Sequence, residues 1–298
     1  MMTETTANPT LAADGQARHP NVDLSVPPVP VRHPGQWVIG AIAVLAVAAL
    51  VLSLAQNEKL DWGTVGAYLF TPSVLQGLLV TFELAAIGMV IGVALGILLA
   101  LARMSHSRVL RGLASGYIWV FRGVPLLVQL LVWGNLGLLF ATLGVGIPFT
   151  DLTLLEVNTN VLVTGFVAAC LGLGLHEAAY MAEVVRGGIM SVDPGQREAA
   201  IALGMGGTTA MRRVVLPQAM RVIVPPTGNQ FISLLKATSL VSVIAGGDLL
   251  TVVQNIGAVN FRTLEMLFVA TFWYLVVVSV LSALQHILER RLSRGYTR

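Results

Sequence analysis

Two ionisable residues lie inside long apolar segments of this 298-residue chain. Glu177 follows His176 and precedes Tyr180, and Lys236 lies in the stretch LLKATSL. An ionisable side chain at membrane depth costs free energy and by default marks a functional site. A carboxylate on a transport path would hold the ammonium or guanidinium group of an amino acid. Two other roles stay open for Glu177, which are pairing with a nearby arginine and hydration close to the cytoplasm.

The residues that follow Lys236 add hydroxyl groups to this set. Thr238 and Ser239 come directly after Lys236-Ala237. One interpretation places Lys236, Thr238 and Ser239 on the lining of a transport path together with Glu177. In the alternative, Lys236 extends its charge to the membrane interface, and the hydroxyls make ordinary hydrogen bonds between helices. The residues alone leave both interpretations open.

The chain lacks the residue patterns of bond-making chemistry. No nucleophile–base pair is visible, the five histidines have no metal-ligand spacing, and the single cysteine, Cys170, can form no internal disulfide. The phosphate-cradling motif GxxxxGK[ST] does not occur, so ATP would have to be bound by another chain. We therefore expect a protein that is not an enzyme and that holds no cofactor or metal of its own.

The elements that must position these residues are membrane helices. Hydrophobic residues make up 55% of the chain and charged residues only 11%, against about 25% charged in a typical soluble domain. A helix needs about 20 apolar residues to cross a bilayer. We predict an all-α membrane protein with about six spans, near 37–55, 78–103, 120–144, 160–184, 224–247 and 266–288. The first is expected to be an uncleaved anchor that follows a flexible, Pro-rich tail over 1–36.

The distribution of arginine fixes the orientation of these spans. Basic residues crowd the alternate loops and the end of the chain, whereas the other loops carry mainly acids. Loops rich in Lys and Arg stay in the cytoplasm, which puts both termini there. Because these cations fall between apolar runs and form no basic soluble face, we expect no nucleic acid partner. Arg122, at the expected start of the third span, is assigned to packing and topology, and a direct contact with the substrate is the alternative.

The stretch QREAAIALGMGGTTAMRRVVLPQAMR, residues 196–221, is the polar part of the longest predicted cytoplasmic loop, about 185–223. Its first part contains good helix formers, and three glycines then allow an unusual turn. Thr208 or Thr209 is expected to cap a second helix, and Leu216-Pro217 to interrupt it before the chain re-enters the membrane. Docking to a cytoplasmic partner and contact with anionic lipid headgroups fit this pattern equally well.

Glu198-Ala199-Ala200, Gly204 and Leu216-Pro217 resemble the EAA loop of ABC importer permeases. The wider sequence resembles the branch of that family for polar amino acids, of the histidine, glutamine and arginine type. The blocks that carry this resemblance, over about 75–288, are FRGVPLLVQL (121–130), AAYMAEVVRGGIMSV (178–192), GQREAAIALG (195–204), LPQAMRVIVPPTGN (216–229) and LLKATSLVS (234–242).

The resemblance implies a type I (MetI-like) importer transmembrane domain over 75–290. It implies that Glu198, Ala199, Ala200 and Gly204, with Leu216 and Pro217, contact a separate ATPase subunit. It further implies an extracytoplasmic binding protein, a second permease copy or paralogue, a polar amino acid as substrate, and a bacterial inner membrane. Typical members have five core spans, so residues 37–74 form an additional helix and external loop, and 291–298 a basic tail.

Two points stay open at this stage. An ion-coupled secondary transporter would use Glu177 and Lys236 as relay groups, but the inverted repeat typical of such proteins is not visible.

Gly88, Gly92 and Gly96 recur at four-residue spacing on one helix face, which favours close helix packing, either inside one subunit or at a dimer seam.

Overall fold

The computed structural model describes residues 34–146 and 153–293, and the chain divides into two compact units after Asn57. Within the first unit, the described element is the helix α1 (Pro34–Ala55). Its segment Gly35–Ala55 has a mean hydropathy of 2.8, and its side chains are exposed on all sides. A helix that is apolar all round is suited to a membrane span. The predicted tails, 1–36 and 291–298, lie largely outside the described residues.

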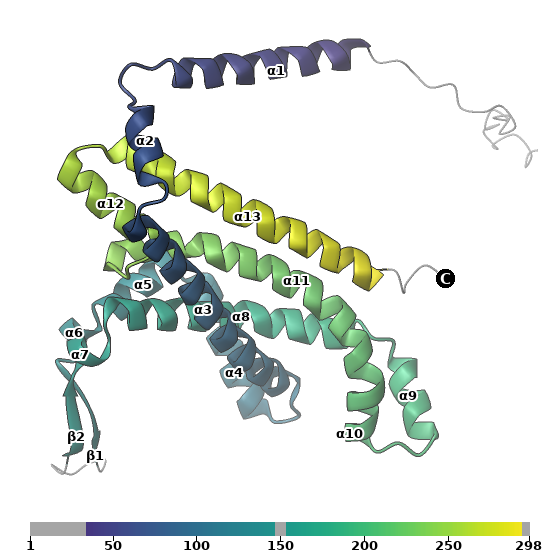
Figure 1. The fold of residues 1–298 in the computed structure, drawn as a ribbon. Coiled ribbons are helices and arrows are strands. Elements are labelled where there is room, and N and C mark those ends of the chain that lie inside the picture. The colour runs from purple at the N-terminus through teal and green to yellow at the C-terminus, as the bar shows by residue number, and fades with distance from the viewer. Residues whose placement is uncertain (1–33, 147–152, 294–298) are drawn as a thin grey trace, which may run out of the picture. The chain divides into compact units, whose positions relative to one another are not determined.

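The second unit is helical apart from one hairpin (Figure 1). Its first half contains the helices α2 (Trp62–Tyr68), α3 (Pro72–Met104), α4 (Arg108–Gly123), α5 (Leu126–Gly134), α6 (Leu136–Leu139), α7 (Thr159–Leu162) and α8 (Gly165–Met190). Its second half contains α9 (Pro194–Ala202), α10 (Gly207–Ala210), the π-helical turn η1 (Met211–Val215), α11 (Leu216–Ala237), the 3-10 helix η2 (Thr238–Ile244), α12 (Leu249–Asn260) and α13 (Thr263–Ser293).

Among the described residues, four helices are long and apolar enough to span a membrane, or up to six if each of two bent pairs is one span. The four helices that qualify singly are α1, α3, α8 and α13. The bent pairs are α4 with α5, at 99°, and the continuous helix Gly207–Ile244 with α12, at 44°. The prediction of about six membrane spans is therefore compatible with this arrangement, and the cytoplasmic location of both termini stays a prediction.

The third predicted span, 120–144, is wrong in its bounds. The helix α4 begins at Arg108 and ends at Gly123, and α5 occupies only Leu126–Gly134. Val124-Pro125 breaks the helix because proline offers no N–H and disfavours helical geometry in the residue before it. Arg122 thus ends α4 instead of opening a span. The strands β1 (Thr142–Gly146) and β2 (Thr153–Asn158) then form an antiparallel hairpin in which Thr142 pairs with Asn158 and Gly144 with Glu156.

The expected domain boundary near residue 75 lies later than the boundary between the two units. The helix α2 falls in the predicted extra segment 37–74, yet it packs on α13. The ring of Trp62 lies 5.1 Å from that of Phe268, and Trp273 donates a hydrogen bond of 2.8 Å to the carbonyl of Leu69. Asp61 caps α2, and hydrogen bonds from the hydroxyl and backbone N–H of Thr64 lower the pKa of its carboxyl group.

The packing of α3 against α8 forms the centre of the second unit. Gly88, Gly92 and Gly96 are buried on α3 and face α8. A Cβ atom placed on Gly92 would lie 2.7 Å from Cγ of Glu177, and one on Gly96 would lie 2.6 Å from Cβ of Met181. Of the two locations open for this glycine face, the structure shows the one inside the subunit. Because the backbones approach so closely, α3 and α8 are expected to move as one body.

Candidate functional site

The first part of the polar stretch 196–221 lies in the short helix α9, which is joined to the end of α8 by three residues. Asp193 caps α9 by accepting a hydrogen bond of 2.8 Å from the N–H of Gly195, and Pro194 occupies the first helical turn. The sequence analysis did not identify this helix start. An aspartate followed by proline is a known signal for it, because the aspartate accepts a free N–H and proline has none to satisfy.

Gly204 ends α9 in a Schellman motif. Its φ of +82° is left-handed, the N–H of Met205 donates to the carbonyl of Ala200 at 3.0 Å, and the N–H of Gly204 donates to that of Ile201 at 2.9 Å. Only glycine adopts this conformation without a steric cost from Cβ. The four-residue spacing from Ala200 to Gly204 is therefore the spacing that this pair of terminal hydrogen bonds requires.

The left-handed geometry of this turn gives a prediction for Gly204. Gly204→Val should destabilise the turn by about 1–2 kcal/mol, because a β-branched residue is strongly disfavoured at positive φ. Gly204→Asn should cost less, since asparagine tolerates the left-handed region. Limited proteolysis of the reconstituted protein should cut the 190–215 region faster in the valine variant than in the asparagine variant. Equal cleavage of both variants would contradict the role assigned to φ.

The surface of α9 differs in part from the expectation. Glu198 and Ala199 are exposed, as is Ala202, whereas Ala200 is buried at 4% exposure. Ala200 therefore packs inside the chain, where α9 lies against η1, and is not part of the exposed face. The small side chains available to an approaching surface are Ala199 and Ala202.

The helix that follows the glycine turn also differs from the expectation. It begins at Gly207 after Gly206, so Thr208 and Thr209 lie inside its first turn and do not cap it. Leu216-Pro217 does not interrupt it either. The wide turn η1 lets the N–H of Leu216 donate to the carbonyl of Met211, five residues earlier, and the helix continues past Pro217. A π-turn is one way in which a helix accommodates a local irregularity of this kind.

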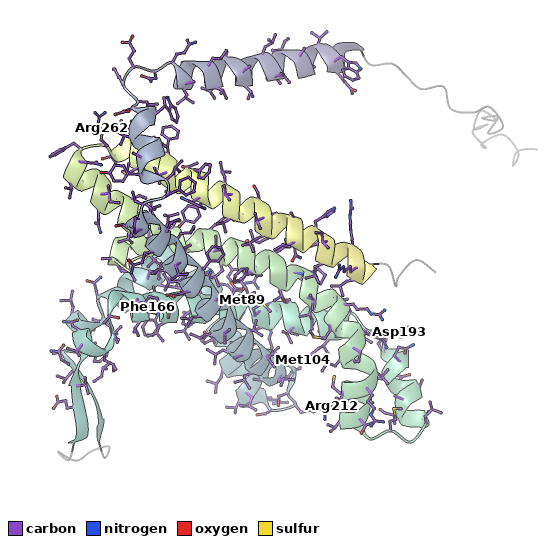
Figure 2. The ribbon with its side chains drawn as sticks, in the orientation of Figure 1. Met89, Met104, Phe166, Asp193, Arg212 and Arg262 are labelled. Carbon is purple, nitrogen blue, oxygen red and sulfur yellow. The ribbon has the colours of Figure 1, made fainter. Side chains whose placement is uncertain are left out.

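Figure 2 shows Met104, Asp193 and Arg212 at the same end of the second unit. A pocket of about 430 Å³ lies between α9 and the ends of α3 and α8. Its lining includes Met104, Met190, Glu198, Ile201 and Met211. Through these residues and the short connection to α8, a displacement of α9 would act on the α3–α8 body.

Glu177 lines a second pocket, of about 230 Å³, between α5, α8 and α11. The side chain is 4% exposed, and its Oε1 atom accepts no hydrogen bond from the described residues. The pocket is lined by Leu126, His176, Glu177, Tyr180, Gln230, Ser233, Leu234 and Ala237. A buried carboxylate oxygen without a partner is costly, and a cation in the pocket would remove that cost.

The other predicted path residues lie outside this lining. Lys236 is exposed and directly precedes the lining residue Ala237. Thr238 donates to the carbonyl of Leu235 at 2.7 Å, and Ser239 to that of Lys236 at 2.8 Å. In these hydrogen bonds both hydroxyls bond to the backbone of their own segment, and not to another helix as the alternative interpretation expected.

Gln230 and Ser233 are pocket residues that the sequence analysis did not select. With Leu234 and Ala237 they are spaced at three, four and seven residues along α11, which places them on one helix face. That spacing, next to the ionisable Lys236, was the available signal.

Gln129 joins the break between α4 and α5 to α8. Its amide nitrogen donates to the carbonyls of Phe121 and Val124, at 3.0 and 2.8 Å, and lies 3.1 Å from Nδ1 of His176. Without Gln129, the two carbonyls at the end of α4 would lose this partner. It is the third polar residue that the sequence analysis did not select. Gln129 lies within the stretch FRGVPLLVQL (121–130), and no pattern in that stretch marks it out from its neighbours.

The chain is similar to known transport proteins over most of its length. The family model described as binding-protein-dependent transport system inner membrane component matches residues 92–294. The arginine transport system permease protein ArgU of Corynebacterium glutamicum is 45% identical over 270 residues, which cover 90% of this chain and 84% of that protein. The L-cystine transport system permease protein TcyB of Bacillus subtilis is 38% identical over 243 residues, covering 81% and 95%.

A solved structure supports the same relationship. The crystal structure of an amino acid ABC transporter with histidines aligns with a TM-score of 0.66 and 38% identity, covering 78% of this chain and 99% of that one. The solved structure agrees with the helical fold described above, and the family match and the two relatives agree with it in sequence. The chain belongs to the family of binding-protein-dependent transport system inner membrane components.

Proposed function

We propose that this chain is the permease subunit of an ATP-driven importer that carries polar amino acids delivered by an extracytoplasmic binding protein. The observation that carries the proposal is the exposed helix α9, held by the Asp193 cap and the Gly204 turn, in a chain of this family. The names of the relatives, which refer to arginine and L-cystine transport, support an amino acid as substrate. The chain contributes path and coupling surface and makes no chemical bond.

In this proposal, a separate ATPase subunit docks on α9 through Glu198, Ala199 and Ala202. ATP closes the ATPase dimer, which moves α9 together with the α3–α8 body and switches the path from inward- to outward-facing. The energetic requirement is that ATP binds one of these states more tightly than the other. A second permease, identical or a paralogue, supplies the second coupling loop. ATP is bound by the partner, so this chain needs no cofactor.

We further propose that the pocket around Glu177 favours an amino acid with a cationic side chain. The carboxylate is buried, has an oxygen without a partner, and shares its pocket with the polar side chains of Gln230 and Ser233. A guanidinium or ammonium group would supply the missing hydrogen-bond donors and charge. The name of the 45% identical relative, an arginine permease, agrees with this preference.

The test is uptake into vesicles that contain the permease with its ATPase and binding protein. We expect Glu177→Gln to lower the uptake of a basic amino acid by about ten- to hundredfold, because a charge-assisted hydrogen bond in a buried site contributes about 1.5–3 kcal/mol. The matched control is Glu83→Gln, which makes the same change on an exposed side chain of α3. It should leave uptake unchanged.

The outcomes separate the two parts of the proposal. Unchanged uptake of the basic amino acid by Glu177→Gln would remove Glu177 from the substrate site. Failure of the unmodified complex to take up any polar amino acid with ATP would contradict the importer itself.

A further inference from the structure

Arg122 has surroundings that its assignment to packing and topology does not explain. It lies in the last turn of α4, directly before the break at Val124-Pro125. Its guanidinium carbon is 5.1 Å from the centroid of the Tyr180 ring on α8, a cation–π contact. Within the described ranges, 34–146 and 153–293, the ion pairs of the structure include none with Arg122.

Arg122 lines a third pocket, of about 520 Å³, whose walls come from α3, α4 and α8. The lining residues are Arg103, Ser115, Ile118, Trp119, Arg122, Gly123, Tyr180 and Glu183. Glu183, the acid of this lining, is already paired with Arg103 of α3 and, at 2.8 Å, with Arg186. The pocket is thus bordered by the exposed Arg122, whose guanidinium group forms none of the ion pairs found among the described residues.

Tyr180 lies between this third pocket and the pocket of Glu177, since its side chain lines both. On one side, its ring centroid is 5.0 Å from that of His176, and on the other side it contacts Arg122. Glu183 and Arg186 follow Tyr180 along α8 toward α9. The order along α8 is thus the Glu177 pocket, Tyr180, the Arg122 pocket and then the coupling loop.

We propose that Arg122 binds the α-carboxylate of the amino acid after it has passed Tyr180, so that the third pocket is an exit station of the transport path. The inference rests on the proposed importer function. Guanidinium presents paired donors that match a carboxylate. Before the substrate arrives, the cation–π contact with Arg122 keeps the Tyr180 ring between the two pockets. The substrate carboxylate then binds the guanidinium group in place of the ring, and the ring is free to move. The phosphate of an anionic lipid shares the chemistry of a carboxylate here, and the test separates the two.

The experiment measures amino acid transported per ATP hydrolysed by the complete complex in vesicles, at saturating loaded binding protein. Arg122→Gln should lower this ratio by about tenfold, and Arg122→Lys should lower it less, because lysine keeps the charge but loses the paired donors. The control is Arg111→Gln, on an arginine of the same helix that is exposed like Arg122 but does not line the pocket. It should behave like the unmodified complex.

Several results would overturn the exit station. One is a ratio for Arg122→Gln equal to that of Arg111→Gln. Should the glutamine variant fail to assemble, an unchanged ratio in Arg122→Lys would have the same meaning. A defect that appears in vesicles with anionic lipid and vanishes in purely zwitterionic ones would assign the pocket to a lipid headgroup. No transport by the unmodified complex would instead contradict the importer function, and the exit station, which rests on that function, would be contradicted with it.

Discussion

Gly96→Ala is expected to lower the melting temperature of the purified protein by several degrees. The added Cβ atom would lie 2.6 Å from Cβ of Met181 and 3.0 Å from the backbone nitrogen of Ala182. A backbone atom in a helix cannot turn aside as a side chain can, so α3 and α8 would have to separate. Overpacking of this kind costs about 1–3 kcal/mol, and each kcal/mol corresponds to about 2–4 °C in a domain of this size.

The control for this prediction is Gly116→Ala on α4, where an added Cβ atom meets nothing within 4 Å. Alanine is the better helix former by up to about 1 kcal/mol, so this variant should be as stable as the original or slightly more so. The two changes are chemically identical and are expected to have opposite signs. A melting temperature that falls equally in both would contradict the close packing of α3 on α8.

Glu198→Lys is expected to abolish ATP-dependent uptake, with a loss of at least about tenfold, while the permease remains in the membrane. Glu198 is exposed on α9 and lines the pocket between α9 and the ends of α3 and α8. A reversed charge at a docking surface places like charges together or leaves a partner charge unpaired. The measurement is uptake by the complex, together with the amount of ATPase that co-purifies with the permease.

The matched control is Thr209→Lys, which adds a positive charge at an exposed position of α10, outside α9. Uptake should survive this change. If both lysine variants lost uptake to the same extent, the effect would come from added positive charge near the membrane and not from the coupling surface.

The extent of α3, α8 and α13 was largely predictable from the sequence, because a long apolar helix must satisfy its backbone internally wherever it contacts lipid. The bent α4–α5 pair was not, since α4 carries apolar residues on one face and arginines at both ends, so hydropathy averaged over a window underestimates it. Only the structure showed that Val124-Pro125 turns the chain by 99° instead of beginning a helix.

In the predicted coupling loop, too, some features could be predicted from the sequence and others could not. The helix and the glycine turn followed from propensity, and the turn lies where Gly204 predicts it. The burial of Ala200 and the continuation of the helix past Pro217 depend on the packing of α9 against η1, which no local pattern encodes. In the pocket of Glu177, that residue was predicted because a charge in an apolar segment is conspicuous, whereas the positions of Gln230 and Ser233 there depend on neighbours far away in sequence. The same is true of Arg122 in the third pocket.

The most direct test of the central claim is amino acid uptake into vesicles containing this permease, measured with and without its ATPase, its binding protein and ATP. The proposed importer predicts uptake only when all three are present, and no dependence on an ion gradient. Uptake that persists without the ATPase and follows a proton or sodium gradient would contradict it, and would favour an ion-coupled transporter in which Glu177 carries the coupling ion.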